Sequence, residues 1–135
     1  MASRDILNSI KVTPAINPGA AITGNAATNG AVIDTQGFES VTFAVQSGTI
    51  TDGSFAVKIQ EGDQPTLSDA SDVVAGDYIG AAISFAAAAN NLVKKIGYRG
   101  SHRYIRAVLT QAGATNGGVM SAVAILGNAH NNPVA

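Results

Sequence analysis

The residues of this chain with the clearest chemical potential lie in one basic segment that also contains tyrosines. Five of the eight lysines and arginines fall between positions 94 and 106, with two tyrosines interleaved among them. Cations and aromatic rings together suit phosphate contact and base stacking, so a nucleic-acid interface is one hypothesis. Neighbouring residues of a strand point to opposite faces, so the charges of Lys94 and Lys95 would be separated. The net charge of −1 also gives the chain little overall attraction for a nucleic acid. The pattern therefore favours a protein partner over nucleic acid, while a solvated strand end whose tyrosines cap the core stays open as the alternative. The contact candidates are Lys94, Lys95, Tyr98, Arg99, Arg103, Tyr104 and Arg106.

Catalytic or metal chemistry has few residues to draw on. The chain has no cysteine and two histidines, His102 and His130, which we expect to be surface turn residues. A zinc or iron site calls for two or three histidines at suitable spacing, and no Gly-x-Ser-x-Gly segment marks a nucleophilic serine. Five carboxylates lie between residues 61 and 77 without EF-hand spacing, so a solvated acidic loop is favoured over a calcium site. We expect no enzyme activity, no metal and no cofactor.

Composition predicts that strands position these residues. The bulky apolar residues are mainly 12 Val and 12 Ile, against 5 Leu, and β-branched side chains favour pleated sheets. Fifteen glycines and ten asparagines indicate many tight turns. The most apolar window, residues 78–89, is well short of the roughly 20 residues of a membrane span, and residues 1–8 lack the apolar core of a signal peptide. These features predict a chain that works in a cytosol-like compartment or on a particle assembled there.

Alternation of apolar and polar residues gives the clearest strands. Residues 39–46 place Val41, Phe43 and Val45 on one face, and residues 54–60 do the same with three apolar side chains. We expect these strands to form a hairpin around residues 51–53, and strands 92–98 and 103–110 to pair around the turn at 99–102. A polar turn at 112–118 should precede a last strand, residues 119–127. That strand lacks alternation, so both its faces should be covered, by the core or by a partner.

These elements predict an all-β fold, an antiparallel β-sandwich of jelly-roll type with little or no helix. Residues 1–30 are expected to be an N-terminal arm with short strands near residues 10–12 and 20–23, separated by turns at Thr13-Pro14 and Asn17-Pro18-Gly19. Residues 31–127 form the sandwich and residues 128–135 a tail. Residues 86–89 are read as part of a strand, turn and strand over 78–89, with a short alanine helix as the alternative.

Three segments together resemble a known group of viral proteins. They read Lys-Ile-Gln-Glu-Gly-Asp at 58–63, Asp-Val-Val-Ala-Gly-Asp-Tyr-Ile-Gly at 72–80, and Lys-Ile-Gly-Tyr-Arg-Gly at 95–100 followed by Arg-Tyr-Ile-Arg-Ala-Val-Leu-Thr at 103–110. These segments are similar to small proteins encoded beside the major capsid gene of tailed bacteriophages, most of all to podovirus-like cement or decoration proteins, over roughly residues 38–127. The resemblance implies a jelly-roll subunit, often dimeric, bound to the outside of the expanded capsid across capsomer boundaries.

The expected function is therefore that of a structural virion protein on the capsid exterior. Its partner would be the major capsid protein, with a homodimer formed in part by residues 119–126, an N-terminal arm that orders on the capsid, and no membrane partner. The first alternative is a phage neck, tail or head-fibre component that contacts host glycan. A sugar-binding module is less favoured, because the chain has only seven aromatic residues and no tryptophan to form a platform.

Overall fold

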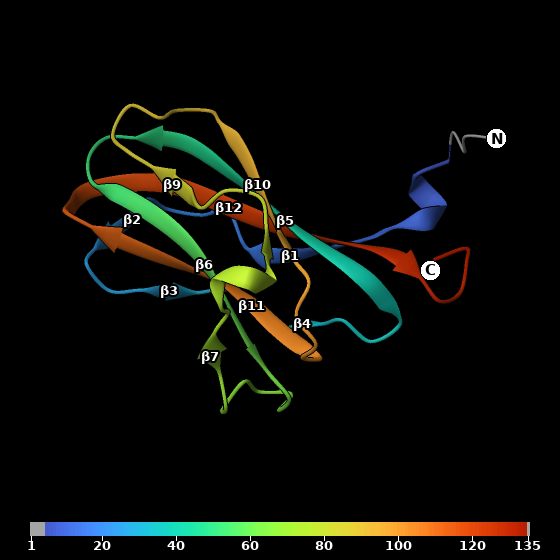
Figure 1. The fold of residues 1–135 in the computed structure, drawn as a ribbon. Coiled ribbons are helices and arrows are strands. Elements are labelled where there is room, and N and C mark those ends of the chain that lie inside the picture. The colour runs from blue at the N-terminus through green and yellow to red at the C-terminus, as the bar shows by residue number, and fades with distance from the viewer. Residues whose placement is uncertain (1–4, 135) are drawn as a thin grey trace.

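The computed structural model describes residues 5–134, which form two antiparallel β-sheets packed face to face (Figure 1). Sheet A has the strand order β1-β12-β5-β10-β8, and β2 also pairs with β12. Sheet B has the order β3-β11-β6-β7, with β4 also on β11 and β9 also on β6. Within the described residues the only helical elements are two short 3-10 turns, so the expected all-β sandwich is confirmed. The elements are η1 (Leu7–Ser9), β1 (Lys11–Ile16), β2 (Ile22–Gly24), β3 (Thr28–Asn29), β4 (Ile33–Asp34), β5 (Phe38–Ile50), β6 (Ser54–Gly62), β7 (Ser71–Asp72), η2 (Ala75–Asp77), β8 (Tyr78–Ile79), β9 (Ile83–Phe85), β10 (Val93–Tyr98), β11 (Tyr104–Ala112) and β12 (Ala114–Ala129).

The connections identify the sandwich as a jelly roll. The chain passes from sheet A to sheet B after β2, β5, β8 and β10, and returns to sheet A after β4, β7, β9 and β11. The early strand β1 pairs with the last strand, β12, which brings the two ends of the domain into one sheet. This exchange between two sheets is the jelly-roll arrangement that the sequence predicted.

The two predicted hairpins are wrong, because each turn joins strands of different sheets. β5 pairs with β10 and β12, whereas β6 pairs with β11, β7 and β9. Alternation shows which side chains of a strand are buried, but it does not identify the partner strand. The turn at 51–53 is tied instead to β12, since Asp52 accepts hydrogen bonds from the backbone amides of Asn116 and Gly117. The turn at 99–102 crosses between the sheets in the same way, from β10 to β11.

The predicted buried faces of the two alternating strands are confirmed. Val41, Phe43 and Val45 of β5 and Phe55, Val57 and Ile59 of β6 are all buried, with at most 7% of any of them exposed. Since β5 and β6 lie in different sheets, the two faces meet across the interior instead of side by side. Burial of these large side chains supplies the main stabilisation of the sandwich.

Residues 11–29 supply strands to both sheets. β1 and β2 pair with β12 in sheet A, and β3 pairs with β11 in sheet B. Ala15 and Ile16 at the end of β1 are buried in the core. The expected turn at Thr13-Pro14 is wrong, because β1 runs through it with Pro14 opposite Val123. Proline is tolerated there because β1 is an edge strand, where a missing N–H removes no ladder bond on the outer side.

The last part of the chain differs from expectation in length. β12 begins at Ala114, so the predicted polar turn at 112–118 is mostly strand, and its amides pair with β2 and with Asp52. β9 contains Ile83 and Phe85 with the spacing of two that the sequence indicated, but it ends at Phe85, so the strand expected to include residues 86–89 is wrong; these residues form a turn, and not the alternative helix either. Near the C-terminus, the amide of Val134 donates to the carbonyl of Asn8, which places η1 and the tail side by side (Figure 1).

Candidate functional site

The seven contact candidates do not form one surface. Lys94 and Lys95 point to opposite sides of β10, since they lie opposite Val45 and Ala44 of β5 respectively. Tyr98 is buried at the end of the same strand. Arg99 and Arg103 lie in and just after the turn that joins β10 to β11, while Tyr104 and Arg106 belong to β11 in sheet B. The structure therefore distributes the basic segment over two sheets and one turn.

Tyr98 is a structural residue and not a free contact. Its hydroxyl donates to Oε2 of Glu61 at 2.6 Å and accepts from the backbone N–H of His102 at 3.2 Å. Burial, followed by the hydrogen bond to the Glu61 carboxylate, raises the pKa of Tyr98. A Cβ on Gly100 would overlap the Tyr98 ring, so the turn closes against this ring only because residue 100 is glycine. The tyrosine thus caps the core, as one reading of the sequence proposed.

His102 extends the same polar group onto the surface. Its Nδ1 lies 3.1 Å from Oδ1 of Asp63, and its Nε2 lies 3.9 Å from Oε1 of Glu61. The hydrogen bond with Asp63 raises the pKa of His102, since it favours the charged imidazolium. The side chains of three segments, β6, the loop after it and the turn at 99–102, therefore meet at this corner of the sandwich.

Arg103 is held by its own chain. Its Nε and Nη2 donate to Oδ1 and Oδ2 of Asp34 at 2.9 and 2.8 Å, and Nη2 also donates to the Gln36 side chain. The guanidinium lowers the pKa of the Asp34 carboxyl through this pair of hydrogen bonds. Thr35 closes the contact, because its hydroxyl donates to the Arg103 carbonyl at 2.7 Å. Arg103 therefore fastens the β4–β5 connection to β11.

Other candidates also have internal partners. Arg106 donates twice to the side-chain oxygen of Gln60 on the outer face of sheet B. Lys94 donates to the carbonyl of Ser84 at 2.6 Å, with its ammonium 4.9 Å from the centre of the Phe85 ring. The Arg103 guanidinium lies 5.0 Å from the Tyr104 ring. Within residues 5–134, Arg99 and Lys95 are therefore the two candidates whose side chains interact with no other side chain.

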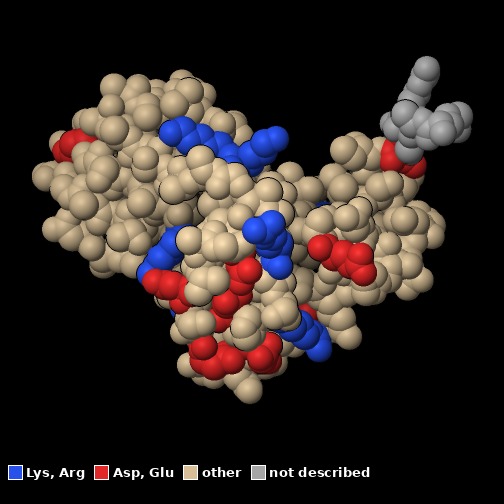
Figure 2. All heavy atoms as spheres, viewed as in Figure 1, with Lys and Arg blue, Asp and Glu red and all other residues tan. Residues whose placement is uncertain are grey.

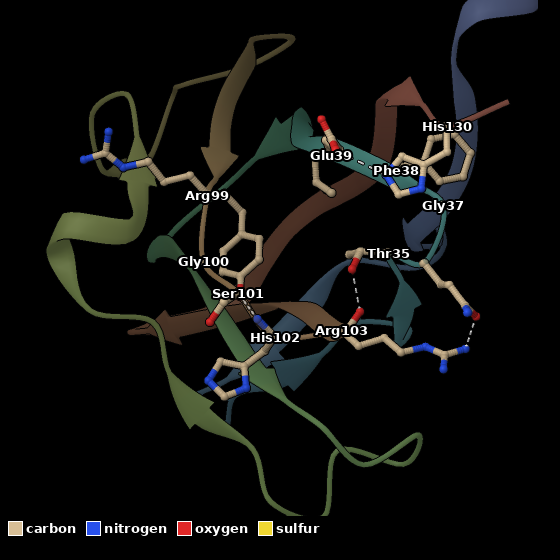
Figure 3. A pocket seen from close by; sticks show the side chains of 13 residues that line it. Thr35, Gly37, Phe38, Glu39, Arg99, Gly100, Ser101, His102, Arg103 and His130 are labelled. Carbon is tan, nitrogen blue, oxygen red and sulfur yellow. Dashed lines mark hydrogen bonds and ion pairs between the residues drawn. The ribbon is translucent and has the colours of Figure 1, made fainter. Parts of the chain in front are cut away.

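A cleft of about 460 Å³ lies beside the turn, between the β4–β5 connection and residues 98–103 (Figure 3). Phe38, Val41 and Tyr98 contribute apolar lining, and His130 approaches Glu39 at 3.4 Å on its rim. Figure 3 shows Arg99 directed away from the other labelled side chains, and His102 and His130 on different sides of the cleft. The two imidazoles are paired with carboxylates, and within residues 5–134 no group of three or more His, Asp or Glu is arranged to hold a metal.

The outer face of sheet A is a surface of a different kind. Register places Val12 opposite Ile125, and Pro14 opposite Val123, so all four side chains share this face. The same face continues through Thr42, Ala44 and Gln46 of β5 to Val93 of β10 and Ile79 of β8. Val93, Val12 and Ile79 remain 63%, 56% and 55% exposed. We call this set the A face; it comprises Val12, Pro14, Thr42, Ala44, Gln46, Ile79, Val93, Lys95, Gly97, Ser121, Val123 and Ile125.

Sequence reasoning found one strip of the A face and missed the rest. The lack of alternation in residues 119–127 indicated that both sides of this strand are covered. In the structure, Met120, Ala122, Ala124 and Leu126 fill the core, while Val123 and Ile125 point outward with no layer above them in the described chain. The exposed residues of β1, β8 and β10 join this strip only through strand register, which the sequence does not display.

Comparison with known proteins assigns the chain to no family. No family model matches it, and no curated protein matches it. Among solved structures, a chain from the structure of infectious bursal disease virus, Gx strain, superimposes with a TM-score of 0.46 and 12% sequence identity. The superposition covers 92% of this chain and 33% of that one, so the present chain spans about a third of the length of its structural neighbour. A likeness this distant says nothing of function.

The outer face of sheet B differs in chemistry from the A face. Lys58 forms an ion pair with Asp72 at 2.9 Å, and Arg106 is bonded to Gln60, so charges there are matched within the chain. Figure 2 shows acidic and basic side chains intermingled over the lower end of the molecule, around β7, and broad uncharged areas elsewhere. None of the helical turns in residues 5–134 is long enough or apolar enough to span a bilayer. Of the surfaces described, the A face has the composition of a protein-docking surface.

Proposed function

We propose that this chain is a structural virion protein that binds the major capsid protein on the outside of a phage head, as a cement or decoration protein. The observation that carries the proposal is the A face, which has Lys95 as its one charged residue. Valine, isoleucine and proline side chains of β1 and β12 lie on one side of the outward residues of β5, and Val93 and Ile79 lie on the other. Soluble proteins rarely leave such a surface open to water, because its burial is favourable by roughly 25 cal/mol for each Å². A partner protein is the occupant that this chemistry suits.

The dimensions of the A face suit a contact that is repeated many times. Five strands at a spacing of about 4.8 Å, and about five residues along a strand at a rise of about 3.3 Å, give a footprint of about 19 by 13 Å between backbone positions. This is roughly a third of the 800 Å² that each partner contributes to a standard stable interface. One such contact alone is weak, but copies that bridge neighbouring capsomers gain avidity of about 10²–10⁴ from the linked second contact.

The rest of the molecule supports a clamp of fixed shape. Ion pairs and hydrogen bonds attach the turns to other parts of the chain. Arg103 bonds Asp34, and Asp52 bonds the start of β12. The resemblance of three segments to phage cement proteins points in the same direction. A rigid jelly roll that docks through the A face holds adjacent capsomers together against the pressure of packaged DNA, and this needs no reactive group.

The experiment that tests the function is a count of copies in purified particles of the phage that carries this gene. Quantitative mass spectrometry would compare peptides of this chain with those of the major capsid protein. Hundreds of copies in a simple ratio to capsid subunits are expected for a protein bound across the icosahedral lattice. A handful of copies would assign the chain to the neck, tail or a head fibre, and none would end the virion proposal.

A further inference from the structure

Lys95 stands alone as the charged side chain of the A face. It lies opposite Ala44 of β5, and its neighbours along the outward side of β10 are Val93 and Gly97. The Lys95 ammonium makes no ion pair or side-chain hydrogen bond within residues 5–134, in contrast to Lys94 and Lys58. No carboxylate belongs to the A face in the described part of the chain. The charge is therefore left unmatched in the middle of an apolar surface.

A hollow of about 270 Å³ lies directly beside Lys95. Gly97, which pairs with Thr42 on one side and Ile79 on the other, is part of its lining, and a Cβ at this position would come within 3.0 Å of the Ile79 side chain. The lining combines apolar residues with Lys95 and Thr42. The lining residues are Thr42, Ile79, Gly80, Lys95, Ile96 and Gly97.

We propose that this hollow receives an acidic side chain of the partner protein, an Asp or Glu whose carboxylate pairs with the Lys95 ammonium. The inference rests on the proposed function, since it names the chemistry that the A face recognises. When a partner covers an apolar surface, an ammonium inside it loses its water, and this cost is offset only by an opposite charge at hydrogen-bond distance. Thr42 also lines the hollow, and its hydroxyl is the group there that can donate a second hydrogen bond to the same carboxylate.

The same reasoning excludes a second copy of this chain packed A face against A face. A two-fold interface of this kind presents identical residues to each other, so it would bring two Lys95 side chains into one apolar contact with no carboxylate from either copy. The partner of the A face is therefore a different protein that carries an exposed acidic residue within an apolar area. The homodimer expected from the sequence would then use another surface of the molecule.

Carbodiimide coupling on intact heads tests the inference directly. This reagent joins an amine to a carboxylate only when the two are in direct contact, and mass spectrometry identifies the linked peptides. With wild-type chain bound to heads that lack it, the expected product joins Lys95 to an Asp or Glu of the major capsid protein. A Lys95 crosslink to another copy of this chain, or bound chain with no Lys95 crosslink, would overturn the proposal.

The affinities of three variants for the same heads provide a second test. Lys95→Met should bind the same heads about 30-fold more weakly and Lys95→Glu more weakly still, because each leaves the partner carboxylate buried without its cation. Lys58→Met is the matched control, since it removes the same charge from the outer face of sheet B. Equal binding of Lys95→Met and wild type would overturn the Lys95 pairing and leave the capsid function standing. No binding of the wild-type chain to heads would instead refute the proposed function itself.

Discussion

The hydroxyl of Tyr98 in β10 donates a 2.6 Å hydrogen bond to Oε2 of Glu61 in β6, and this bond joins sheet A to sheet B. Both residues are buried, with 5% and 7% of their surface exposed. A buried carboxylate is costly unless donors satisfy it, and Tyr98 supplies a direct one. The pair thus links the turn at 99–102 to the core at one end of the sandwich.

Replacement of Tyr98 by Phe should destabilise the fold by about 1–3 kcal/mol. The ring would still fill its site, but the Glu61 carboxylate would lose its buried donor and the His102 amide its acceptor. Urea denaturation followed by circular dichroism measures the change. Tyr104→Phe is the control and should stay within about 0.5 kcal/mol of wild type, since Tyr104 lies on the outer side of β11. Coincident curves for Tyr98→Phe and wild type would show that the bond contributes nothing.

Gly100→Ala should also destabilise the fold, by about 1–3 kcal/mol, because the added methyl group overlaps the Tyr98 ring. The turn would have to move away from Glu61, so the Tyr98 hydroxyl would lose its alignment. Gly19→Ala serves as the comparison, since a Cβ there meets nothing within 4 Å. The thermal midpoints of both variants are the measurement. A Gly100→Ala protein as stable as Gly19→Ala would mean that the ring and the turn do not pack as described.

His102 should make stability depend on pH between about 5 and 8. The hydrogen bond with Asp63, with further attraction from Glu61 and Asp69, raises the folded pKa of His102 above its unfolded value of about 6.5. A raised pKa means that the contribution is complete below about pH 6.5 and is lost as pH rises through the folded pKa. The difference in free energy of unfolding between wild type and His102→Gln should therefore be largest near pH 5.5 and shrink toward pH 8. Asp63→Asn should reduce this dependence, and a difference that grew with pH would contradict the assignment.

The three sequence segments 58–63, 72–80 and 95–110 pack against one another in this fold. Arg106 in the last segment bonds Gln60 in the first, and Tyr98 bonds Glu61. The middle segment joins them, because the Tyr78 hydroxyl accepts from the backbone N–H of Ile59 and Arg99 donates to the carbonyl of Gly76. Residues far apart in the sequence thus form one packed corner of the sandwich.

Local patterns in the sequence predict the strands and their buried faces, but they do not identify which strands pair with one another. Val41, Phe43 and Val45 were readable because period-two alternation is a property of the strand itself. The turn at 51–53 was read as a hairpin because its anchor, the start of β12, lies 64 residues further along the chain. The sequence likewise makes Arg103 a contact candidate, because its internal partner Asp34 is 69 residues away. The A face likewise exists only after β1, β5, β8, β10 and β12 take their places.

Exposed valines at two sides of the A face give the most direct test of the docking surface. Val12 lies on the edge strand β1 and Val93 on β10, and both are more than half exposed, so Val12→Asp and Val93→Asp should change the thermal midpoint little. Each should lower affinity for heads by about tenfold or more, because a carboxylate enters an apolar contact without a partner.

Ala56→Asp and Thr110→Asp make comparable changes on the outer face of sheet B, where the two residues lie opposite each other and are exposed. Cosedimentation of each variant with heads that lack the protein measures binding. We expect both sheet B variants to bind as wild type does, and most of each A face variant to remain in the supernatant at the concentration that half-saturates wild type. The reverse pattern would place the docking surface on sheet B, because an added charge weakens binding only where the partner removes it from water.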